Sequence, residues 1–434
     1  MSSQTSDIRK VAFASFIGST LEWYDFFIFG AATALVFNQL FFPSFDPVTG
    51  TIAAFATFAV GFIARPLGGI VFGHYGDRIG RKAMLVLSLT MMGGVTTIIG
   101  LIPTYETIGI GAPILLTLLR FLQGFAVGGE WGGATLMVVE HAPDRTRGFY
   151  GSWPQMGIPA ALLLSSGVMA AVGALMSDAQ FMAWGWRLPF LFSAVLLLLG
   201  IVIRLGLTES PSFRKLKADG VREPLPAVEV LRNQGRRTAL LIACQAAENV
   251  PFYITAVYSL VYLTAAVGMD RGVALDALMV AAVACLITQP IFAALSDRIG
   301  RKKVFRSGMI FNGLFIVPFF LMLDTANPVM ITLAMTLALV FGQATTQSTQ
   351  PSLFAEQYSP SIRYSGVSIA YQFATVLWSG PTPMIAAALF AWSGSWIPLA
   401  CYIVVAAVLS VLTIAPLREA AGQPLEQQEE NHRG

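Results

Sequence analysis

The sequence predicts an all-α membrane protein with twelve transmembrane helices in two pseudo-symmetric six-helix bundles. Its 434 residues are 55% hydrophobic and 12% charged, whereas soluble domains have about 45–50% and about 25%. Twelve apolar stretches are long enough to span a bilayer. The string Asp-Arg-Ile-Gly-Arg-Lys occurs twice between such stretches, starting at Asp77 and at Asp297. A repeated charged loop in a membrane protein indicates two homologous halves and is typical of transporters whose site lies between the halves.

A second repeat supports this division. Glu140 precedes Arg147 by seven residues, and Glu356 precedes Arg363 by the same spacing. Because both repeats have nearly the same offset along the chain, chance is a poor explanation. We expect each half to contribute equivalent charged loops.

A transmembrane helix needs about 20 apolar residues. Six stretches of this length precede a charged, proline-containing segment, and six follow it. The twelve stretches cover residues 11–37, 49–73, 83–102, 113–139, 149–174, 187–207, 239–267, 274–295, 304–323, 328–354, 364–391 and 395–415.

The chain is therefore expected to have four parts. They are an N-terminal six-helix bundle (1–207), a cytoplasmic linker (208–238), a C-terminal six-helix bundle (239–417) and a cytoplasmic tail (418–434).

The basic residues predict the orientation. Lys and Arg gather in the loops on one side, whereas the opposite loops contain only Arg187 and Arg271. Because cytoplasmic loops carry the excess of Lys and Arg, both termini are expected in the cytoplasm. The first apolar stretch is too long for a cleaved signal and is expected to remain as a helix. The net charge of +3 is explained by these loops, so nucleic-acid binding is not indicated.

Six ionisable residues fall inside the predicted helices. Each costs about 2.5–3.5 kcal/mol at the bilayer centre on insertion scales, so such residues normally face a partner or a watery cavity. Five of the six lie in the first half, which favours ion coupling there. They are Glu22, Asp25, Arg65, Arg120, Glu130 and, in the second half, Glu248.

Asp25 and Arg120 are expected at the same depth, roughly 20 Å from the cytoplasmic face. An Asp beside an Arg stays ionised, and it can take a proton when the Arg is drawn to a substrate anion. A permanent ion pair joining two helices is the alternative. Glu22 lies three residues before Asp25 on the same helix face, so it is a second candidate proton carrier, or it only satisfies nearby polar groups.

Arg65 and Glu130 are both expected in the inner half of the membrane, where they can pair. Arg65 either binds a substrate carboxylate or anchors its helix. Glu130 is flanked by Gly128-Gly129 and Gly132-Gly133, which indicates tight helix packing and leaves a purely structural role open.

The second half supplies neutral polar side chains instead. These suit hydrogen bonds to the hydroxyls or carbonyls of a small polar solute, and hydrogen bonding between helices is the alternative. Aromatic residues can stack on a ring or simply pack. With Arg65 and Arg120, the candidate substrate contacts are Tyr24, Gln155, Glu248, Asn249, Tyr253, Gln347 and Gln372.

Cofactor signatures are missing from the sequence. There is no Gly-x-x-x-x-Gly-Lys-Ser/Thr loop for ATP, and His74, His141 and His432 are scattered and form no metal-ligand cluster. We therefore expect neither a cofactor nor a metal, with the proton as coupling ion.

The run from Gly73 to Lys82 resembles the loop 2–3 signature of the major facilitator superfamily, and its partial copy at Asp297 resembles the loop 8–9 repeat. The motifs Glu22-Trp-Tyr-Asp-Phe, Arg65-Pro-Leu-Gly-Gly and Thr208-Glu-Ser-Pro are similar to those of its metabolite:proton symporter branch. The resemblance covers nearly the whole chain.

This resemblance implies proton-driven uptake of a small organic acid, shikimate- or dicarboxylate-like, by alternating access. It also implies a bacterial inner-membrane protein that works as a monomer in the lipid bilayer. The loop charges would act as a cytoplasmic latch that selects between the two access states. The gating candidates are Asp77, Arg78, Arg81, Glu140, Arg147, Asp297, Arg301, Glu356 and Arg363.

Three other functions stay open. Symport of a zwitterion such as proline or betaine fits the same branch. An efflux antiporter is less favoured, because Gly151 to Pro159 does not contain the Gly-Pro-x-x-Gly-Gly pattern of drug/proton antiporters. A non-transporting nutrient sensor is the least favoured of the three, because it would need a longer cytoplasmic extension than this linker and tail. An enzyme is not expected, because the sequence contains no metal site and no evident nucleophile arrangement.

Overall fold

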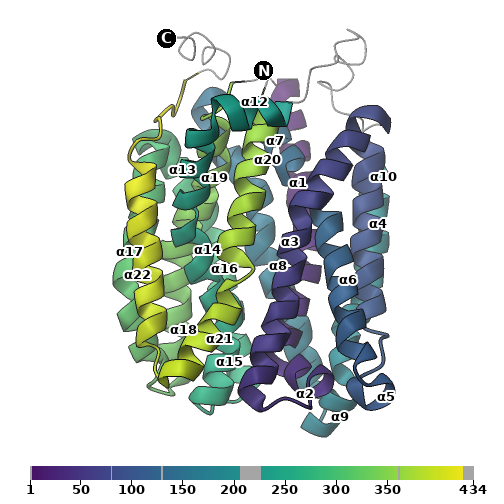
Figure 1. Ribbon diagram of the computed structural model, residues 1–434. Helices are drawn as coiled ribbons and strands as arrows, with labels where there is room; N and C mark the ends of the chain where they lie inside the picture. Colours follow the sequence, from purple (N-terminus) through teal and green to yellow (C-terminus); the bar gives the residue numbers. More distant parts are fainter. Residues whose placement is uncertain (1, 80, 129–130, 206–225, 360–361, 424–434) are drawn as a thin grey trace.

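The computed structural model describes residues 2–79, 81–128, 131–205, 226–359 and 362–423. All regular structure within these ranges is helical. Two groups of long, roughly parallel helices stand side by side, the N-terminal group in purple to blue and the C-terminal group in green to yellow (Figure 1). The predicted pair of helical bundles is confirmed.

Eleven helices among the described residues are long and apolar enough to cross a membrane. A shorter apolar segment, Val86–Ile99, supplies the third crossing, so the order of twelve helices agrees with the sequence. Apolar side chains cover the outside of these helices, as Ile70 and Leu198 illustrate with exposures of 71% and 66%. Such surfaces suit lipid rather than water.

The first bundle follows the predicted order. Its helices are α1 (Ser2–Ala32), continued by η1 (Thr33–Phe37) and α2 (Asn38–Phe41), α3 (Pro47–Ile79), α4 (Arg81–Ile99), α6 (Gly111–Val127) with α7 (Trp131–His141), α8 (Arg147–Leu175) and α10 (Leu188–Leu205). Short elements in its connections are α5 (Tyr105–Ile108), η2 (Asp144–Thr146), α9 (Asp178–Ala183) and η3 (Gly185–Arg187).

The linker contributes one short helix, α12 (Pro226–Asn233). The seventh crossing is divided into α13 (Gly235–Cys244), α14 (Ala246–Tyr253), η4 (Ile254–Tyr258), α15 (Ser259–Val261) and η5 (Tyr262–Ala266). The remaining crossings are α16 (Arg271–Ile299), α17 (Arg301–Leu323), α18 (Pro328–Leu337) with η6 (Ala338–Gln343) and α19 (Ala344–Ala355), α20 (Arg363–Ala374) with η7 (Thr375–Ser379) and α21 (Thr382–Ser393), and α22 (Ile397–Ile414).

Wide turns interrupt the helices of the second bundle that carry the neutral polar residues. The elements η4, η5, η6 and η7 are π-helical and lie in the seventh, tenth and eleventh crossings. A π-helical turn leaves the regular hydrogen-bond ladder and frequently marks a functional site. The first crossing also contains a π-helical turn, η1, so the backbone departs from regularity in the first, seventh, tenth and eleventh crossings.

Glycines bring α3 and α6 into direct backbone contact. A Cβ added at Gly124 would overlap the carbonyl oxygen of Gly61, and one added at Gly128 would overlap that of Arg65. The tight packing expected around Gly128 is confirmed, and only residues without a side chain allow it. This crossing fixes the two helices that carry Arg65 and Arg120.

The two bundles contact each other through α8 and α16 along their length. In Figure 1, α12 and both chain ends lie at one end of the molecule, which we call the linker end, while α2, α5 and α9 lie at the opposite end, the far end. At the far end Arg271 of the second bundle forms an ion pair of 2.8 Å with Asp178 of the first. Contacts therefore join the bundles at the far end as well as at the linker end.

Candidate functional site

Two buried arginines of the first bundle lie against one aromatic ring. The guanidinium carbons of Arg65 on α3 and Arg120 on α6 are 4.7 Å and 4.2 Å from the centroid of Phe26 on α1. Both side chains are almost fully buried, with exposures of 1% and 0%. Aromatic faces attract cations and partly replace the lost water. The ring of Phe26 therefore helps two like charges to share one region of the interior.

Each arginine keeps an unused hydrogen-bond donor. Arg120 donates to the side-chain oxygen of Gln123 and to the backbone oxygen of Phe58, at 3.4 Å for the latter. Its Nη2, like the Nε of Arg65, has no hydrogen-bond partner in the described structure. A buried donor without a partner costs about 1–3 kcal/mol. An anionic ligand would remove this cost.

Tyr253 brings the second bundle to the same place. Its ring centroid lies 5.6 Å from that of Phe62, 6.2 Å from that of Phe58 and 6.4 Å from that of Phe26. The three phenylalanines belong to α1 and α3, whereas Tyr253 ends α14. The arginine cluster is therefore closed on one side by an aromatic side chain from the other bundle.

Asp25 is buried next to this cluster, but its carboxylate pairs with a hydroxyl rather than with a guanidinium. Ser193 on α10 donates to Oδ1 of Asp25. Gln123 lies between Asp25 and Arg120, because it accepts from Arg120 and its Nε2 donates to the backbone oxygen of Asp25 at 3.4 Å and to Thr96 at 2.7 Å. Asp25 and Arg120 therefore lie on either side of Gln123, and an amide bridge takes the place of an ion pair in this conformation.

The other candidates of the first bundle are Glu22, Glu130 and Tyr24. Glu22 is buried on α1, with an exposure of 5%. Glu130 lies outside the described residues, so its predicted pair with Arg65 is untested. Tyr24 donates to the backbone oxygen of Pro189 at 2.8 Å and packs on Phe192. Its hydroxyl is therefore engaged inside its own bundle in this conformation.

Amide side chains connect the two bundles nearer the linker end. Gln155 on α8 donates to Gln350 at 2.9 Å, and Gln350 donates to Gln245 at 2.8 Å. Gln372 on α20 donates to the backbone oxygen of Gly128 at 2.8 Å. Gln155, Gln350 and Gln372 thus join helices of different bundles. Such hydrogen bonds are expected of a gate as well as of a solute site.

An aromatic stack reinforces this contact. The rings of Trp131 on α7 and Tyr371 on α20 lie with centroids 3.6 Å apart and planes 6° apart. The indole nitrogen of Trp131 also donates to Gln155 at 3.1 Å. The two aromatic faces close the interface between the bundles on the linker side of the arginine cluster.

The remaining second-bundle candidates differ in how fully they are bonded. Gln347 accepts from Gln289 at 2.6 Å, and Asn249 donates to Gln245 of its own helix segment at 3.2 Å. Glu248 is buried with an exposure of 3%, and its Oε2 has no hydrogen-bond partner in the described structure. Among the described residues, Glu248 therefore has free acceptor capacity, as does Gln372, whose Oε1 also has no hydrogen-bond partner.

Charges at the linker end pair across the bundles. Arg147 of the first bundle contacts Glu356 of the second at 3.2 Å, and Arg363 of the second contacts Glu140 of the first at 3.7 Å. Each repeated Glu therefore pairs with the repeated Arg of the other half. Arg301 also reaches Glu356, at 3.5 Å.

The second copy of the repeated loop takes part in this contact. Asp297 accepts from the backbone nitrogens of Gly148 and Phe149, each at 2.9 Å, and pairs with Arg301 at 2.6 Å. It therefore caps the start of α8 from the other bundle. In the first copy, the side chains of Asp77, Arg78 and Arg81 lie outside the described residues.

Sequence reasoning missed Gln123, Ser193, Gln289 and Trp131. Gln123 could have been found, since it lies one helical turn after Arg120 on the same face. Ser193 is a single hydroxyl in an apolar run and gives no such signal. Among the described residues, His, Cys, Asp and Glu form no group that could hold a metal ion.

Comparisons with known proteins agree with this architecture. The chain matches the Major Facilitator Superfamily over residues 15–383 and 251–433. It is 41% identical to the shikimate transporter of Escherichia coli (strain K12) over 419 residues, 96% of this chain and 95% of that protein. It is 38% identical to the glycine betaine/proline/ectoine/pipecolic acid transporter of Dickeya dadantii (strain 3937), covering 96% and 85%. A solved proton:xylose symporter bound to 6-bromo-6-deoxy-D-glucose superposes with a TM-score of 0.73 at 17% identity, covering 99% of each chain.

Proposed function

Because this chain belongs to the major facilitator superfamily, we propose that it is a secondary active transporter that takes up a small organic acid together with protons. The observation that carries the proposal is the pair of buried guanidiniums around Phe26, each with a donor that lacks a partner among the described residues. Charges this deep in a membrane protein are retained for function. A carboxylate is the ligand that two arginines select.

The solute would lie between the bundles, where Tyr253 closes the arginine cluster. Arg65 and Arg120 would bind its carboxylate. Its hydroxyls would reach the neutral groups of the second bundle, with Gln155, Asn249, Tyr253, Gln347 and Gln372 as contacts. Glu248 has an acceptor oxygen free for a solute hydroxyl. This division explains why the first bundle is charged and the second is rich in amides.

Proton coupling would depend on Asp25. Its carboxylate is buried and bonded to Ser193, while Arg120 is occupied by Gln123. When a solute anion draws Arg120 away, Asp25 loses a nearby positive charge and binds a proton more readily. Glu22 and Glu130 would complete the proton path.

Alternating access would use the charge pairs at the linker end as the inner gate. Opening this end requires Arg147 to leave Glu356 and Arg363 to leave Glu140. The repeated loops, including Asp77, Arg78, Arg81, Asp297 and Arg301, would then find new partners. Such a gate biases the access equilibrium without contacting the solute.

We place the linker end in the cytoplasm of a bacterium and the helices in its inner membrane. The basic loops lie at that end, as the positive-inside rule requires. The division into residues 1–207, 208–238, 239–417 and 418–434 assigns one bundle to each half, and the unit of function is a monomer.

The relatives suggest two solute classes. One relative is a shikimate transporter and another transports betaine, proline, ectoine and pipecolic acid. A zwitterion also carries a carboxylate, so it is the second candidate. Two arginines without an acidic partner among the described residues favour a net anion over a zwitterion.

Uptake into proteoliposomes with an acidic exterior tests the proposal. Purified protein should accumulate radiolabelled shikimate or a dicarboxylate, and a protonophore should abolish the accumulation. Arg120→Lys keeps the charge but loses the planar fork, and it should weaken uptake at least tenfold. Transport of betaine or proline with no transport of organic acids would replace the anion assignment by the zwitterion assignment.

A further inference from the structure

A cavity at the far end of the second bundle has no part in the proposed transport site. It has a volume of about 440 Å³, which falls in the range of small-molecule sites. Its walls come from three separate places: the end of the seventh crossing, the connection between α17 and α18, and the end of α21 with the connection to α22. The lining residues are Tyr262, Ala266, Val267, Asp324, Ala326, Phe390, Gly394, Ser395 and Trp396.

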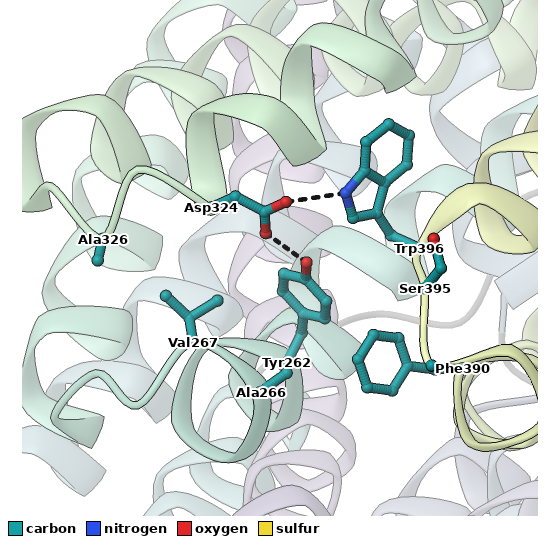
Figure 2. A pocket seen from close by; sticks show the side chains of 9 residues that line it. Tyr262, Ala266, Val267, Asp324, Ala326, Phe390, Ser395 and Trp396 are labelled. Carbon is teal, nitrogen blue, oxygen red and sulfur yellow. Dashed lines mark hydrogen bonds between the residues drawn. The ribbon is translucent and has the colours of Figure 1, made fainter.

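One carboxylate organises the aromatic side of this cavity. The Tyr262 hydroxyl donates to Oδ1 of Asp324, and the Trp396 indole nitrogen donates to Oδ2 at 2.8 Å. Figure 2 shows the carboxylate between these two groups, with the Phe390 ring beside Tyr262. Because both rings are tied to Asp324, their positions are fixed before any ligand arrives.

Further ring contacts hold the wall in place. The centroids of Tyr262 and Phe390 are 5.4 Å apart at an interplanar angle of 85°. Trp396 is stacked on Phe320 with centroids 5.4 Å apart and planes 5° apart. One face of the indole is thus supported from behind, which leaves its other face for a ligand.

The lining of the cavity is negatively charged. Asp324 forms no ion pair within the part of the chain that the structure describes, and the other eight lining residues are uncharged. A carboxylate that accepts two neutral hydrogen bonds keeps its negative charge and further lone pairs. The cavity therefore attracts cations and repels organic anions.

We propose that this cavity binds a small organic ammonium ion, with Asp324 as its counter-ion and Tyr262, Phe390 and Trp396 as its aromatic walls. Alkylated ammonium groups are recognised in this way by aromatic cages. A bare metal cation is a poorer fit, because Ca²⁺ takes six to eight oxygen ligands and Mg²⁺ six, whereas the lining provides one carboxylate. The cavity is thus separate from the anion site in position and in the charge it selects.

Binding of tetramethylammonium chloride to the purified full-length protein in phosphatidylglycerol nanodiscs tests the proposal. Tryptophan fluorescence should change saturably with tetramethylammonium, and neither tert-butanol nor an equal concentration of sodium chloride should reproduce the change. Asp324→Asn removes the charge and keeps one acceptor oxygen, so one of the two ring hydrogen bonds is also lost. It should weaken binding about tenfold or more, a factor that corresponds to about 1.4 kcal/mol.

Two further variants separate the charge of Asp324 from general effects. Asp276→Asn changes the net charge equally at an exposed position outside the lining and should bind like the parent protein. Tyr262→Phe keeps the ring and should bind within about threefold. Equal binding by the parent protein and Asp324→Asn, with both showing the same thermal unfolding, would overturn the proposal, as would saturation by tert-butanol.

Nanodiscs of phosphatidylcholine identify the natural source of the ammonium group. If lipid headgroups occupy the cavity, tetramethylammonium should bind more weakly in phosphatidylcholine than in phosphatidylglycerol. If the ligand comes from the water, the two lipids should give the same affinity. Either result supports an ammonium site, and a failure to bind in both lipids rejects it.

Discussion

Trp131 of the first bundle and Tyr371 of the second lie face to face, with centroids 3.6 Å apart and planes only 6° apart. The pair is buried, with exposures of 4% and 5%. Around it, Gln155 accepts from Trp131 and Gln372 donates to the backbone of Gly128. The bundles cannot separate on the linker side of the arginine cluster without breaking this stack.

Removing one ring should therefore favour opening of the linker end. An aromatic pair contributes about 0.5–1.5 kcal/mol beyond area burial, so Tyr371→Ala should shift the access equilibrium about two- to tenfold toward the open form. Spin labels at Arg145→Cys and Arg298→Cys, one on each bundle, would report the shift as a longer distance distribution.

Tyr371→Phe is the matched control, because it keeps the stacked ring and removes only the hydroxyl. Its distance distribution should match that of the parent protein. If Tyr371→Ala also leaves the distances unchanged, the stack is a passive contact and the gate lies elsewhere.

The two crossed ion pairs at the linker end should differ in strength. Glu356 is fully buried between Arg147 and Arg301, whereas the Glu140 side chain is 38% exposed and 3.7 Å from Arg363. Glu356→Gln leaves two guanidiniums of opposite bundles facing each other, and their repulsion should open the linker end. Glu140→Gln should change the equilibrium by only about 0–1 kcal/mol, as exposed pairs do. The same spin-label pair would measure both variants.

This gate should also respond to pH. Burial raises the pKa of Glu356 above its usual range, although the guanidiniums of Arg301 and Arg147 act against that rise. Above this pKa the carboxylate is charged and holds both arginines. As the pH falls through it, Glu356 becomes neutral and the linker end should open. Glu356→Gln should lack the pH dependence of the distances, and a parallel response in parent and variant would assign it to another group.

The sequence predicted the helices and the charges well, because apolar length and intramembrane cost leave few alternatives. It also identified Glu140, Arg147, Glu356 and Arg363 as a repeat. These pairs cross between the bundles because of the way α8 packs against α19. The periodicity of a single helix holds no information about that packing.

The chemistry around Asp25 was predicted less completely. Depth along two helices predicted that Asp25 lies near Arg120, and the structure joins the two through Gln123. Rotation of each helix about its axis decides which side chain fills the space between them, and here Gln123 does so. Ser193 approaches from a helix 168 positions away, so its contact with Asp25 required the tertiary structure.

Loss of the Asp25 charge should uncouple transport from the proton gradient. Asp25→Asn should abolish accumulation driven by pH, while exchange of labelled for unlabelled solute at equal pH continues. Ser193→Ala removes only the hydrogen bond to the carboxylate, so it should still accumulate solute but with an altered pH dependence. If Asp25→Asn concentrates solute under a pH gradient, the coupling role belongs to another carboxylate.

The glycine crossing of α3 and α6 should be intolerant of a single methyl group. In Gly124→Ala the new Cβ would overlap the backbone oxygen of Gly61. A backbone atom cannot rotate away, so α3 and α6 must separate, at a cost of about 1–3 kcal/mol. Because the same crossing positions Arg65 and Arg120, solute affinity should fall together with thermal stability.

Gly94→Ala on α4 is the matched control, since its Cβ would meet nothing within 4 Å. A helical Gly→Ala change there should stabilise the protein by about 0.5–1 kcal/mol. The thermal unfolding temperatures of the two variants should therefore move in opposite directions, and solute binding should fall only in Gly124→Ala. An unchanged Gly124→Ala protein would show that the two helices do not need this contact.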